Sequence, residues 1–399
     1  MPVFSQIHKN LSETQLKKLA DKLAHQFIIT DGHVDLPYRL RTQNFRPVKE
    51  YLGIPIKTKE GDFDYERAKK GGLDAPFMSI FIPSSYQESG GAKKLADSLI
   101  NMVQSIAKAH PDKFALATSP AEVEKNFKAG IISLPMGMEN GAGIENDLKN
   151  LEYFYQRGIR YITLTHSTPN LICDSSYDPN RKWNGLSPFG QEVVLEMNRL
   201  GIMIDISHVS DSTFYQVLKI SRTPVIASHS SCRKFTPGFE RNMSDDMIQA
   251  LSKQGGVIQI NFGSIFLDGT SNEAYYAKKE ELDQILKDKG LSTDDPRSEA
   301  VISQFEKDNP VLFSDVIRVA DHIDHVVKLA GIDHVGLGSD FDGVGDSLPV
   351  GLKDVSQYPN LIYELLKRGY DEEAIAKICY KNVFRVWKQA EEIALQMKN

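Results

Sequence analysis

Histidines and carboxylates recur at the ends of apolar segments in this sequence. In "IITDGHVDLP" (28–37), His33 and Asp35 close an apolar run and are separated only by Val34. Residues two apart on a strand point to the same side, so both side chains can reach one point. Imidazole nitrogens and carboxylate oxygens are good ligands for zinc and related divalent ions. The pair therefore indicates part of a metal site.

Three further side chains of the ligand type occupy the same kind of position: Glu139 in "GMENG", His208 in "DISH" and His229 in "ASHSS". Five ligands exceed what one tetrahedral ion needs, so we expect two Zn²⁺ ions, with Glu139 as the bridging carboxylate. Between two such ions, roughly 4 Å apart, a shared water is acidified to a hydroxide that attacks a carbonyl. Asp340, in "GSDFDG", would take the proton from that water and pass it to the leaving amine.

Other candidate groups have simpler interpretations. Asp205, in "DISH", is expected to orient its loop or a ligand histidine rather than to bind metal. His322 and His325 are three apart in a predicted helix, which is typical of a packed or solvated helix face. The three cysteines form no disulfide framework and no C-x-x-C metal motif.

Eight short apolar segments must position these residues. They are nearly continuously apolar, which is typical of buried parallel strands, and they cover residues 27–33, 75–82, 130–139, 158–166, 201–208, 223–230, 255–262 and 333–341. Helical patterns lie between them, at 92–111, 187–201, 210–221, 244–256 and 313–331. The alternation predicts an α/β fold, a (β/α)8 TIM-type barrel, whose enzymes hold their active sites at the carboxyl ends of the strands. A doubly wound open sheet is the alternative, less favoured because no G-x-G-x-x-G follows the first strand.

We expect one barrel domain over residues 1–399, with an N-terminal helix over about 12–26. Three connections are too long for simple barrel loops and are predicted to be insertions, at 38–74, 167–186 and 263–312. All three follow the carboxyl ends of predicted strands. Long loops in compact domains are commonly functional.

Composition argues against nucleic-acid-binding and membrane-spanning proteins. Among 399 residues the net charge is −6, which argues against a nucleic-acid partner. No run of 18 apolar residues occurs, so no membrane span is expected. The N-terminal segment lacks a secretory apolar region. These features predict a cytoplasmic protein, or a periplasmic or secreted one if a signal peptide was trimmed.

The motifs, taken in order, resemble a known family. "DGHVDLP", "GMENG", "YITLTH", "WNGLSPFG", "IDISHVS", "ASHSS", "RN" at 241–242 and "GLGSDFDG" run from residue 31 to 343. Together they resemble the membrane (renal) dipeptidase family of zinc peptidases, the M19 group. The resemblance implies a binuclear zinc barrel that hydrolyses dipeptides, including those with a D-residue at the C-terminal position. Members often dimerise, so a homodimer is possible.

The same resemblance implies a role for each site residue. One zinc would be held by His33 and Asp35, the other by His208 and His229, and Glu139 would bridge them. His166 would contact the substrate carbonyl and steady the oxyanion. Arg241 would hold the free carboxylate of the dipeptide, for which a guanidinium fork is well suited. Asp340 would be the catalytic acid and base. The sequence departs from vertebrate members near Phe266, where those members offer a tyrosine to the substrate.

Two other functions compete with the dipeptidase. Another amidohydrolase, acting on a cyclic amide or a similar small amide, would usually begin with His-x-His, whereas position 35 is Asp. A metal-dependent binding protein on an inherited barrel would have no use for both Asp340 and Arg241. The dipeptidase is therefore the favoured hypothesis.

Overall fold

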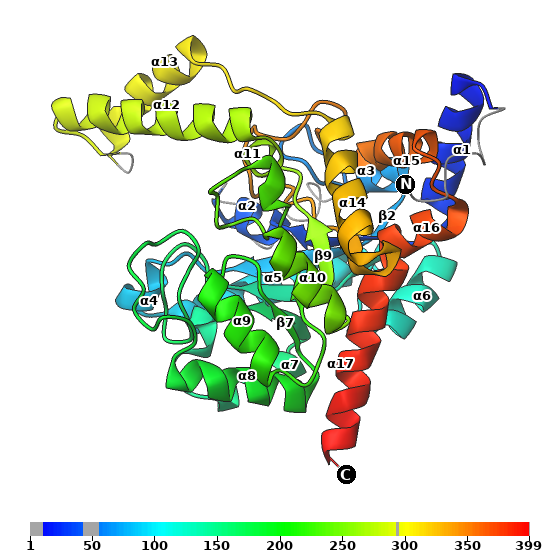
Figure 1. Cartoon of the computed structure of the whole chain (residues 1–399), viewed down its shortest axis with the longest axis horizontal. Helices are drawn as coiled ribbons and strands as arrows, with labels where there is room; N and C mark the ends of the chain where they lie inside the picture. Colours follow the sequence, from blue (N-terminus) through cyan, green and yellow to red (C-terminus); the bar gives the residue numbers. More distant parts are fainter. Residues whose placement is uncertain (1–10, 43–55, 293–294, 399) are drawn as a thin grey trace.

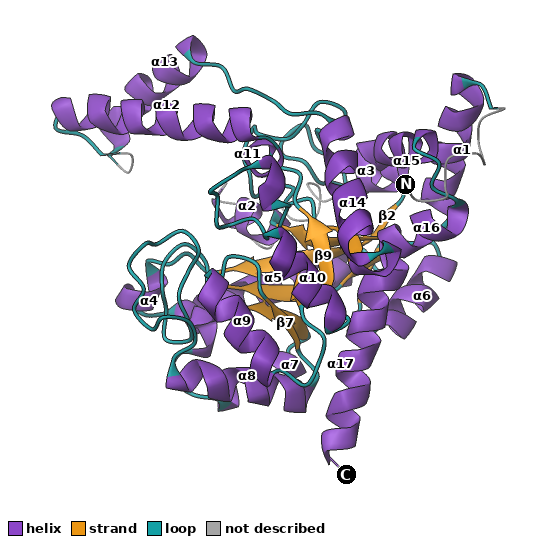
Figure 2. Cartoon of the chain, in the orientation of Figure 1, coloured by secondary structure: helices purple, strands orange, loops and turns teal. Residues whose placement is uncertain are grey.

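Eight parallel strands lie at the centre of the molecule and are surrounded by helices (Figure 2). The computed structural model describes residues 11–42, 56–292 and 295–398. The strands are hydrogen-bonded in the order in which they follow one another in the chain. They are β1 (Ile29–Val34), β2 (Leu73–Phe81), β5 (Met136–Glu139), β6 (Ile159–Thr163), β7 (Met203–Asp205), β8 (Ile226–Ala227), β9 (Val257–Ile260) and β10 (Val335–Leu337).

The first and last strands nearly close the barrel. Val34 and Phe341 form a parallel bridge. The amide of Asp35 donates to the carbonyl of Phe341 (2.8 Å), and the amide of Asp340 donates to the carbonyl of His33 (3.1 Å). The predicted TIM-type barrel is therefore confirmed, and the ends of β1 and β10 lie side by side.

The apolar segment 130–139 is not one strand, as the sequence suggested, but two. β4 (Ile132–Leu134) pairs with β3 (Phe114–Leu116) in a separate two-stranded sheet, and β5 joins the barrel. Pro135 separates them; it has no N–H to donate, and its carbonyl accepts from the amide of Met78 (2.8 Å). Glu139 remains the last residue of a barrel strand.

Helices occupy the predicted places around the barrel. The expected helical segments form α5 (Ala92–Ala109), α8 (Pro188–Leu200), α9 (Asp211–Ile220), α10 (Asp245–Lys253) and α14 (Val316–Ala330). The last four begin directly after a Ser or Asp whose side chain accepts a backbone N–H of the first turn. Further helices are α6 (Pro120–Lys128), α7 (Lys149–Gln156), α15 (Tyr358–Lys367) and α16 (Glu372–Ala376).

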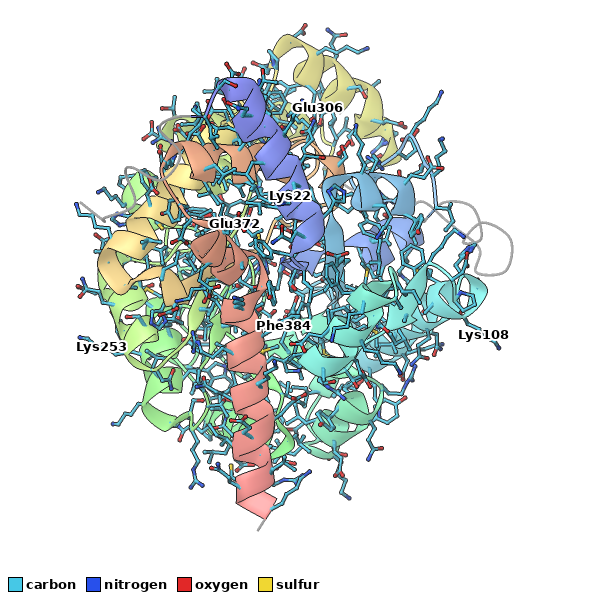
Figure 3. All side chains as sticks on the ribbon, turned by 90° about the vertical axis from the view of Figure 1, so that its right-hand side faces the viewer. Lys22, Lys108, Lys253, Glu306, Glu372 and Phe384 are labelled. Atoms are coloured by element: carbon cyan, nitrogen blue, oxygen red, sulfur yellow. The ribbon has the colours of Figure 1, made fainter. Side chains whose placement is uncertain are left out.

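The long C-terminal helix α17 (Asn382–Lys398) runs along the lower part of the molecule (Figures 1 and 3). Trp387 is completely buried, and its ring centroid lies 5.2 Å from that of Phe77. The same apolar cluster contains residues from the beginnings of several strands: Ile28, Ala75, Met203, Ile226 and Val257. The helix therefore closes the end of the barrel opposite to the predicted site.

The N-terminal helix and the three insertions have distinct structures. The N-terminal helix is α1 (Glu13–Gln26), with Ser12 in a capping box. The first insertion contains the end of α2 (Leu36–Thr42) and α3 (Tyr65–Gly71), and its residues 43–55 lie outside the described part of the chain. The second is tied by two antiparallel bridges, Cys173 with Leu186 and Ser175 with Val209.

The third insertion forms an arm. It contains α11 (Ser264–Leu267), α12 (Gly269–Asp288) and α13 (Glu299–Asp308). The last two helices project from the barrel (Figure 1). Within the described ranges, no helix combines the length and apolar character needed to cross a membrane.

Candidate metal and active site

The predicted site residues meet at the carboxyl ends of the strands. His33 lies in β1 and Glu139 ends β5, whereas Asp35, His166, His208, His229 and Asp340 lie in the first residues after their strands. Candidate ligand atoms lie within 4.8 Å of one another in three overlapping groups: His33, Glu139 and His229; Glu139, His166 and His208; and His33, Asp35 and Asp340. Separate strands thus deliver one continuous cluster.

Glu139 lies at the centre of this cluster and presents its two oxygens to different partners. Its Oε2 is 3.2 Å from Nε2 of His33, which is also 3.3 Å from Oδ2 of Asp35. Its Oε1 is 3.0 Å from Nε2 of His208 and 3.3 Å from Nε2 of His229. Nε2 of His166 is farther from the same oxygen, at 3.7 Å. One carboxylate therefore joins two groups of ligand-type atoms.

Hydrogen bonds on the far side of two rings fix which nitrogen carries the proton. The hydroxyl of Tyr161 donates to the carbonyl of Gly32 (3.0 Å), so it accepts from Nδ1 of His33 (2.8 Å). The hydroxyl of Ser228 donates to Asp205 (2.6 Å), so it accepts from Nδ1 of His229 (2.7 Å). In the neutral form of each ring, Nε2 then presents a lone pair to the cluster.

Asp205 has the orienting position that the sequence suggested. Its Oδ1 accepts the amides of Ser207 (3.0 Å) and Ser228 (2.8 Å). Its Oδ2 accepts the hydroxyls of Thr163 (2.5 Å) and Ser228. With four donors bound, this fully buried carboxylate holds the backbone on both sides of the cluster.

Sequence reasoning missed Tyr161 and Ser228 as supporting residues. Tyr161 lies inside the barrel, with no solvent exposure, on the strand that leads to His166. Ser228 immediately precedes His229, and a hydroxyl beside a candidate ligand was the available signal. No local feature of "RYITLTH" pairs Tyr161 with His33, which is 128 residues away.

The cluster is buried and electrostatically coupled. Burial by itself raises the pKa of Glu139, but the charges of His33 and His166 and hydrogen bonds from His208 and His229 outweigh it and hold that pKa well below its usual range. Burial also lowers the pKa of His229, to about 3, with the charge of His33 acting in the same direction. An ionised carboxylate beside a neutral imidazole is the protonation state that metal binding requires.

Unpartnered polar atoms show that the residues fit a cation. Nε2 of His33 and Oδ1 of Asp35 are buried without a hydrogen-bond partner. Buried polar groups are normally satisfied, so such exceptions gathered in one place call for a missing partner. Nitrogen and oxygen donors from His, Asp and Glu match the ligand preferences of zinc.

Asp340 faces the same cluster from the loop after β10. Its Oδ2 accepts the side-chain amide of Asn261 (2.7 Å). Burial raises its pKa to about 7, and the charges of Asp35 and Glu139 add to the rise against the opposing charge of His33. A carboxyl group that titrates near neutral pH is suited to exchange protons.

Arg241 is 3% exposed and lies beside the ligand-type histidines. Its Nη1 donates to the hydroxyl of Ser230 (2.7 Å) and its Nη2 to the carbonyl of His229 (2.7 Å). Nη2 also lies 3.0 Å from Nε2 of His208. Its buried Nε has no partner, so one N–H of the guanidinium fork is free to bind a ligand.

Residues interpreted as structural do lie outside the cluster. His322 is buried in α14, with bonds to the backbone of Cys232 and Leu267. His325 contacts Asp245 (2.7 Å).

Comparison with known proteins decides the family. Residues 17–399 match the model of "Membrane dipeptidase (Peptidase family M19)". The chain belongs to this family. Among its relatives, Dipeptidase 3 of Mus musculus is 33% identical over 386 residues, which cover 96% of this chain and 68% of that protein.

Solved structures agree with this assignment. The probable dipeptidase PvdM from Pseudomonas aeruginosa superposes with a TM-score of 0.80 at 25% identity, covering 95% of this chain and 99% of that one. A metallopeptidase from Rhodobacter sphaeroides, liganded with a phosphinate mimic of the dipeptide L-Ala-D-Ala, superposes with a TM-score of 0.72 at 26% identity, covering 91% and 99%. This M19 chain is therefore a metallo-dipeptidase with a buried His/Glu cluster able to hold metal.

Proposed function

We propose that this enzyme hydrolyses the peptide bond of dipeptides, including those with a C-terminal D-residue, with two Zn²⁺ ions. The arrangement of Glu139 carries the proposal, because its two oxygens face different sets of ligand-type atoms at 3.0–3.3 Å. His33 and Asp35 would hold one ion, His208 and His229 the other, and Glu139 both. Bound zinc would acidify a water to supply the nucleophile and would polarise the scissile carbonyl.

The chain's own residues would orient the substrate and move the proton. Arg241 would bind the C-terminal carboxylate through its fork, which selects short substrates with a free C-terminus. His166, whose side chain is 23% exposed, would donate to the carbonyl oxygen as negative charge develops there. Asp340 would accept the proton of the attacking water and deliver it to the leaving amine, and the bond from Asn261 keeps its carboxyl directed at the cluster.

The proposal that the enzyme accepts a C-terminal D-residue is supported by a single relative. The relative from Rhodobacter sphaeroides was crystallised with a mimic of L-Ala-D-Ala. We propose the same tolerance here, tested with matched L-L and L-D dipeptides. The expected homodimer stays a prediction, which the solution mass from light scattering tests directly.

A chelation experiment with a dipeptide panel tests the function. We expect cleavage of dipeptides, loss of activity after chelation, recovery with Zn²⁺, and about two zinc ions per chain by elemental analysis. Asp340→Asn should lower kcat by roughly 100-fold to 10,000-fold while zinc content is unchanged. Asp346→Asn, an exposed residue of the same loop, is the matched control.

Three outcomes would contradict the proposal. Full activity in metal-free protein would exclude the metal mechanism. Hydrolysis of a cyclic amide without any dipeptide cleavage would indicate the other amidohydrolase function. Zinc binding without turnover, unaffected by Asp340→Asn, would indicate a binding protein.

A further inference from the structure

Aromatic side chains from three separate loops meet beside Arg241. Phe239 is central among them, because its ring centroid lies 6.0 Å from that of Tyr177, 5.8 Å from that of Phe266 and 6.0 Å from that of Tyr276. Tyr177 belongs to the insertion after β6, Phe239 to the loop after β8, and Phe266 and Tyr276 to α11 and α12 of the arm. We call these four residues the aromatic wall.

The aromatic wall adjoins the candidate site at two points. The ring of Tyr177 lies 5.8 Å from the ring of His208. The guanidinium carbon of Arg241 lies 5.5 Å over the ring of Phe266. Phe266 is 6% exposed whereas Tyr276 is 37% exposed, so the wall runs from the buried site to the surface of the arm.

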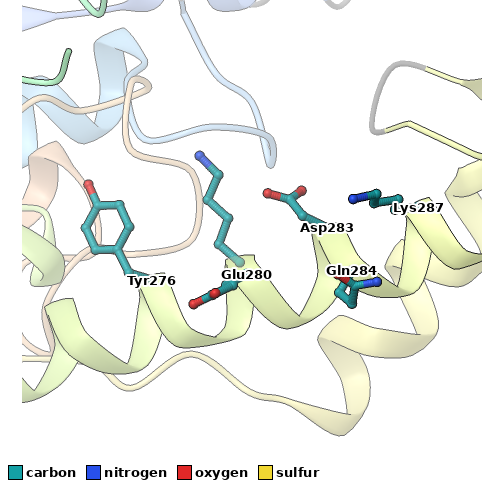
Figure 4. Close-up of a pocket in the computed structure, with 6 residues that line it drawn as sticks. Tyr276, Glu280, Asp283, Gln284 and Lys287 are labelled. Atoms are coloured by element: carbon teal, nitrogen blue, oxygen red, sulfur yellow. The ribbon is translucent and has the colours of Figure 1, made fainter. Parts of the chain in front are cut away.

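Beyond Tyr276 the surface of the arm is lined by charged and polar side chains instead of aromatic rings. Along α12, Tyr276 shares a groove of about 440 Å³ with Lys279, Glu280, Asp283, Gln284 and Lys287 (Figure 4). These groove residues carry charges of both signs, so they favour neither an acidic nor a basic ligand.

We propose that the aromatic wall is the subsite for the side chain of the substrate's C-terminal residue, and that it selects an aromatic or large aliphatic side chain. The inference rests on the proposed function, in which Arg241 binds the C-terminal carboxylate. In the C-terminal residue of the substrate, the carboxylate and the side chain are attached to the same Cα. A side chain whose carboxylate is bound to Arg241 must therefore contact the residues beside Arg241. Phe266 flanks it, Phe239 lies against Phe266, and Tyr276 lies against Phe239 on the outer side.

The arm is then a specificity element. Two of the four wall residues come from the insertion at 263–312, and α12 carries Tyr276 to the edge of the site. Aromatic rings prefer offset or edge-on contact with another ring, and the ring planes of Phe239 and Tyr276 already meet at 60°. A ring on the substrate would extend this arrangement, whereas a glycine residue would leave it unfilled.

Paired substrates test the subsite on the zinc-loaded full chain. The probes are alanyl-phenylalanine and alanyl-glycine, and the readout is the ratio of their kcat/KM values. We expect the wild type to prefer phenylalanine by tenfold or more, within the range of about 10-fold to 200-fold that one apolar contact provides. Tyr276→Ala should lower kcat/KM for alanyl-phenylalanine about tenfold and leave alanyl-glycine within about twofold. Tyr276→Phe should retain the preference, because the ring rather than the hydroxyl makes the contact.

A second variant and a control keep the test decisive. Phe239→Ala should reduce the same ratio, and Tyr215→Ala, which removes an exposed tyrosine of α9 outside the wall, should leave it unchanged. Equal cleavage of the two dipeptides by the wild type, or an equal loss for both in Tyr276→Ala, would overturn the subsite while the dipeptidase function stands. Cleavage of neither dipeptide would overturn the proposed function and the subsite with it.

Discussion

A neutral imidazole can bind a cation only through the nitrogen that carries no proton. His33 and His229 each have an acceptor at Nδ1, the hydroxyls of Tyr161 and Ser228, and each of those hydroxyls has its own proton donated elsewhere. The proton of each ring is therefore held on the side away from Glu139. At this scale the site depends as much on hydroxyl groups as on the ligand-type residues.

Tyr161→Phe tests this control of the ring proton. The variant leaves Nδ1 of His33 without its acceptor in a fully buried position, so the ring is less well oriented. We expect metal affinity to fall by roughly tenfold to 100-fold, as is typical when such a supporting partner is lost. Competition with a chelator of known affinity measures this directly. Tyr155→Phe, on α7, is the control, and unchanged affinity in Tyr161→Phe would contradict the role.

At the scale of elements, an outer helix holds the loop that carries two site residues. In α14, Nδ1 of His322 accepts the amide of Cys232 (3.0 Å), three residues after His229. Its Nε2 donates to the carbonyl of Leu267 (2.9 Å) at the end of α11. The helix thus joins the loop after β8 to the base of the arm, which places Arg241 and the aromatic wall together.

His322→Gln tests this link through its pH dependence. Burial lowers the pKa of His322 from 6.5 to about 3. Between pH 3 and pH 6.5, His322 binds a proton in the unfolded chain but not in the folded chain. The stability that the neutral His322 contributes is therefore complete above pH 6.5 and is lost as pH falls towards 3. Between pH 6.5 and pH 5, this effect lowers the free energy of unfolding of the wild type by about 2 kcal/mol.

Urea unfolding at several pH values, with metal content held constant, measures the effect. His322→Gln should be less stable than wild type at pH 7, because the amide of Cys232 loses its acceptor, at a cost of about 1–3 kcal/mol. The difference between the two proteins should shrink as pH falls from 6.5 to 5. Parallel pH profiles would show that His322 does not titrate as described.

At the scale of the whole molecule, packing at one end of the barrel supports chemistry at the other. The ring of Trp387 lies 5.2 Å from that of Phe77, which lies 5.3 Å from that of Tyr161. Tyr161 in turn contacts His33 through its hydroxyl. A continuous column of side chains therefore connects the C-terminal helix with the candidate metal ligands.

Substitutions of Trp387 measure what this closure contributes. Trp387→Ala removes a fully buried ring and should lower the free energy of unfolding by about 3–5 kcal/mol. Trp387→Phe should cost less, because it keeps a ring and removes an indole N–H that is buried without a partner. Urea unfolding followed by far-UV circular dichroism gives both values. A loss below about 1 kcal/mol in Trp387→Ala would show that α17 is dispensable for the barrel.

Local patterns determined the parts of this protein that depend on neighbours in the chain. Continuous apolar runs predicted the barrel strands, because parallel strands are covered on both faces. Ser and Asp residues before apolar patterns marked the beginnings of α8, α9, α10 and α14, because a cap acts within one turn. The cluster around Glu139 was predictable because parallel strands of a barrel place their carboxyl ends together.

Tertiary structure alone decided the features that join distant residues. The partnership of Tyr161 with His33, the division of the segment 130–139 at Pro135, the closure by Trp387 and the approach of Tyr276 to Phe239 all bring together residues far apart in the chain. No local propensity encodes such contacts, because they form only when the packed barrel fixes where each side chain points. The sequence by itself determined which groups are available for metal chemistry, and the fold decided which nitrogen faces Glu139 and which rings gather beside Arg241.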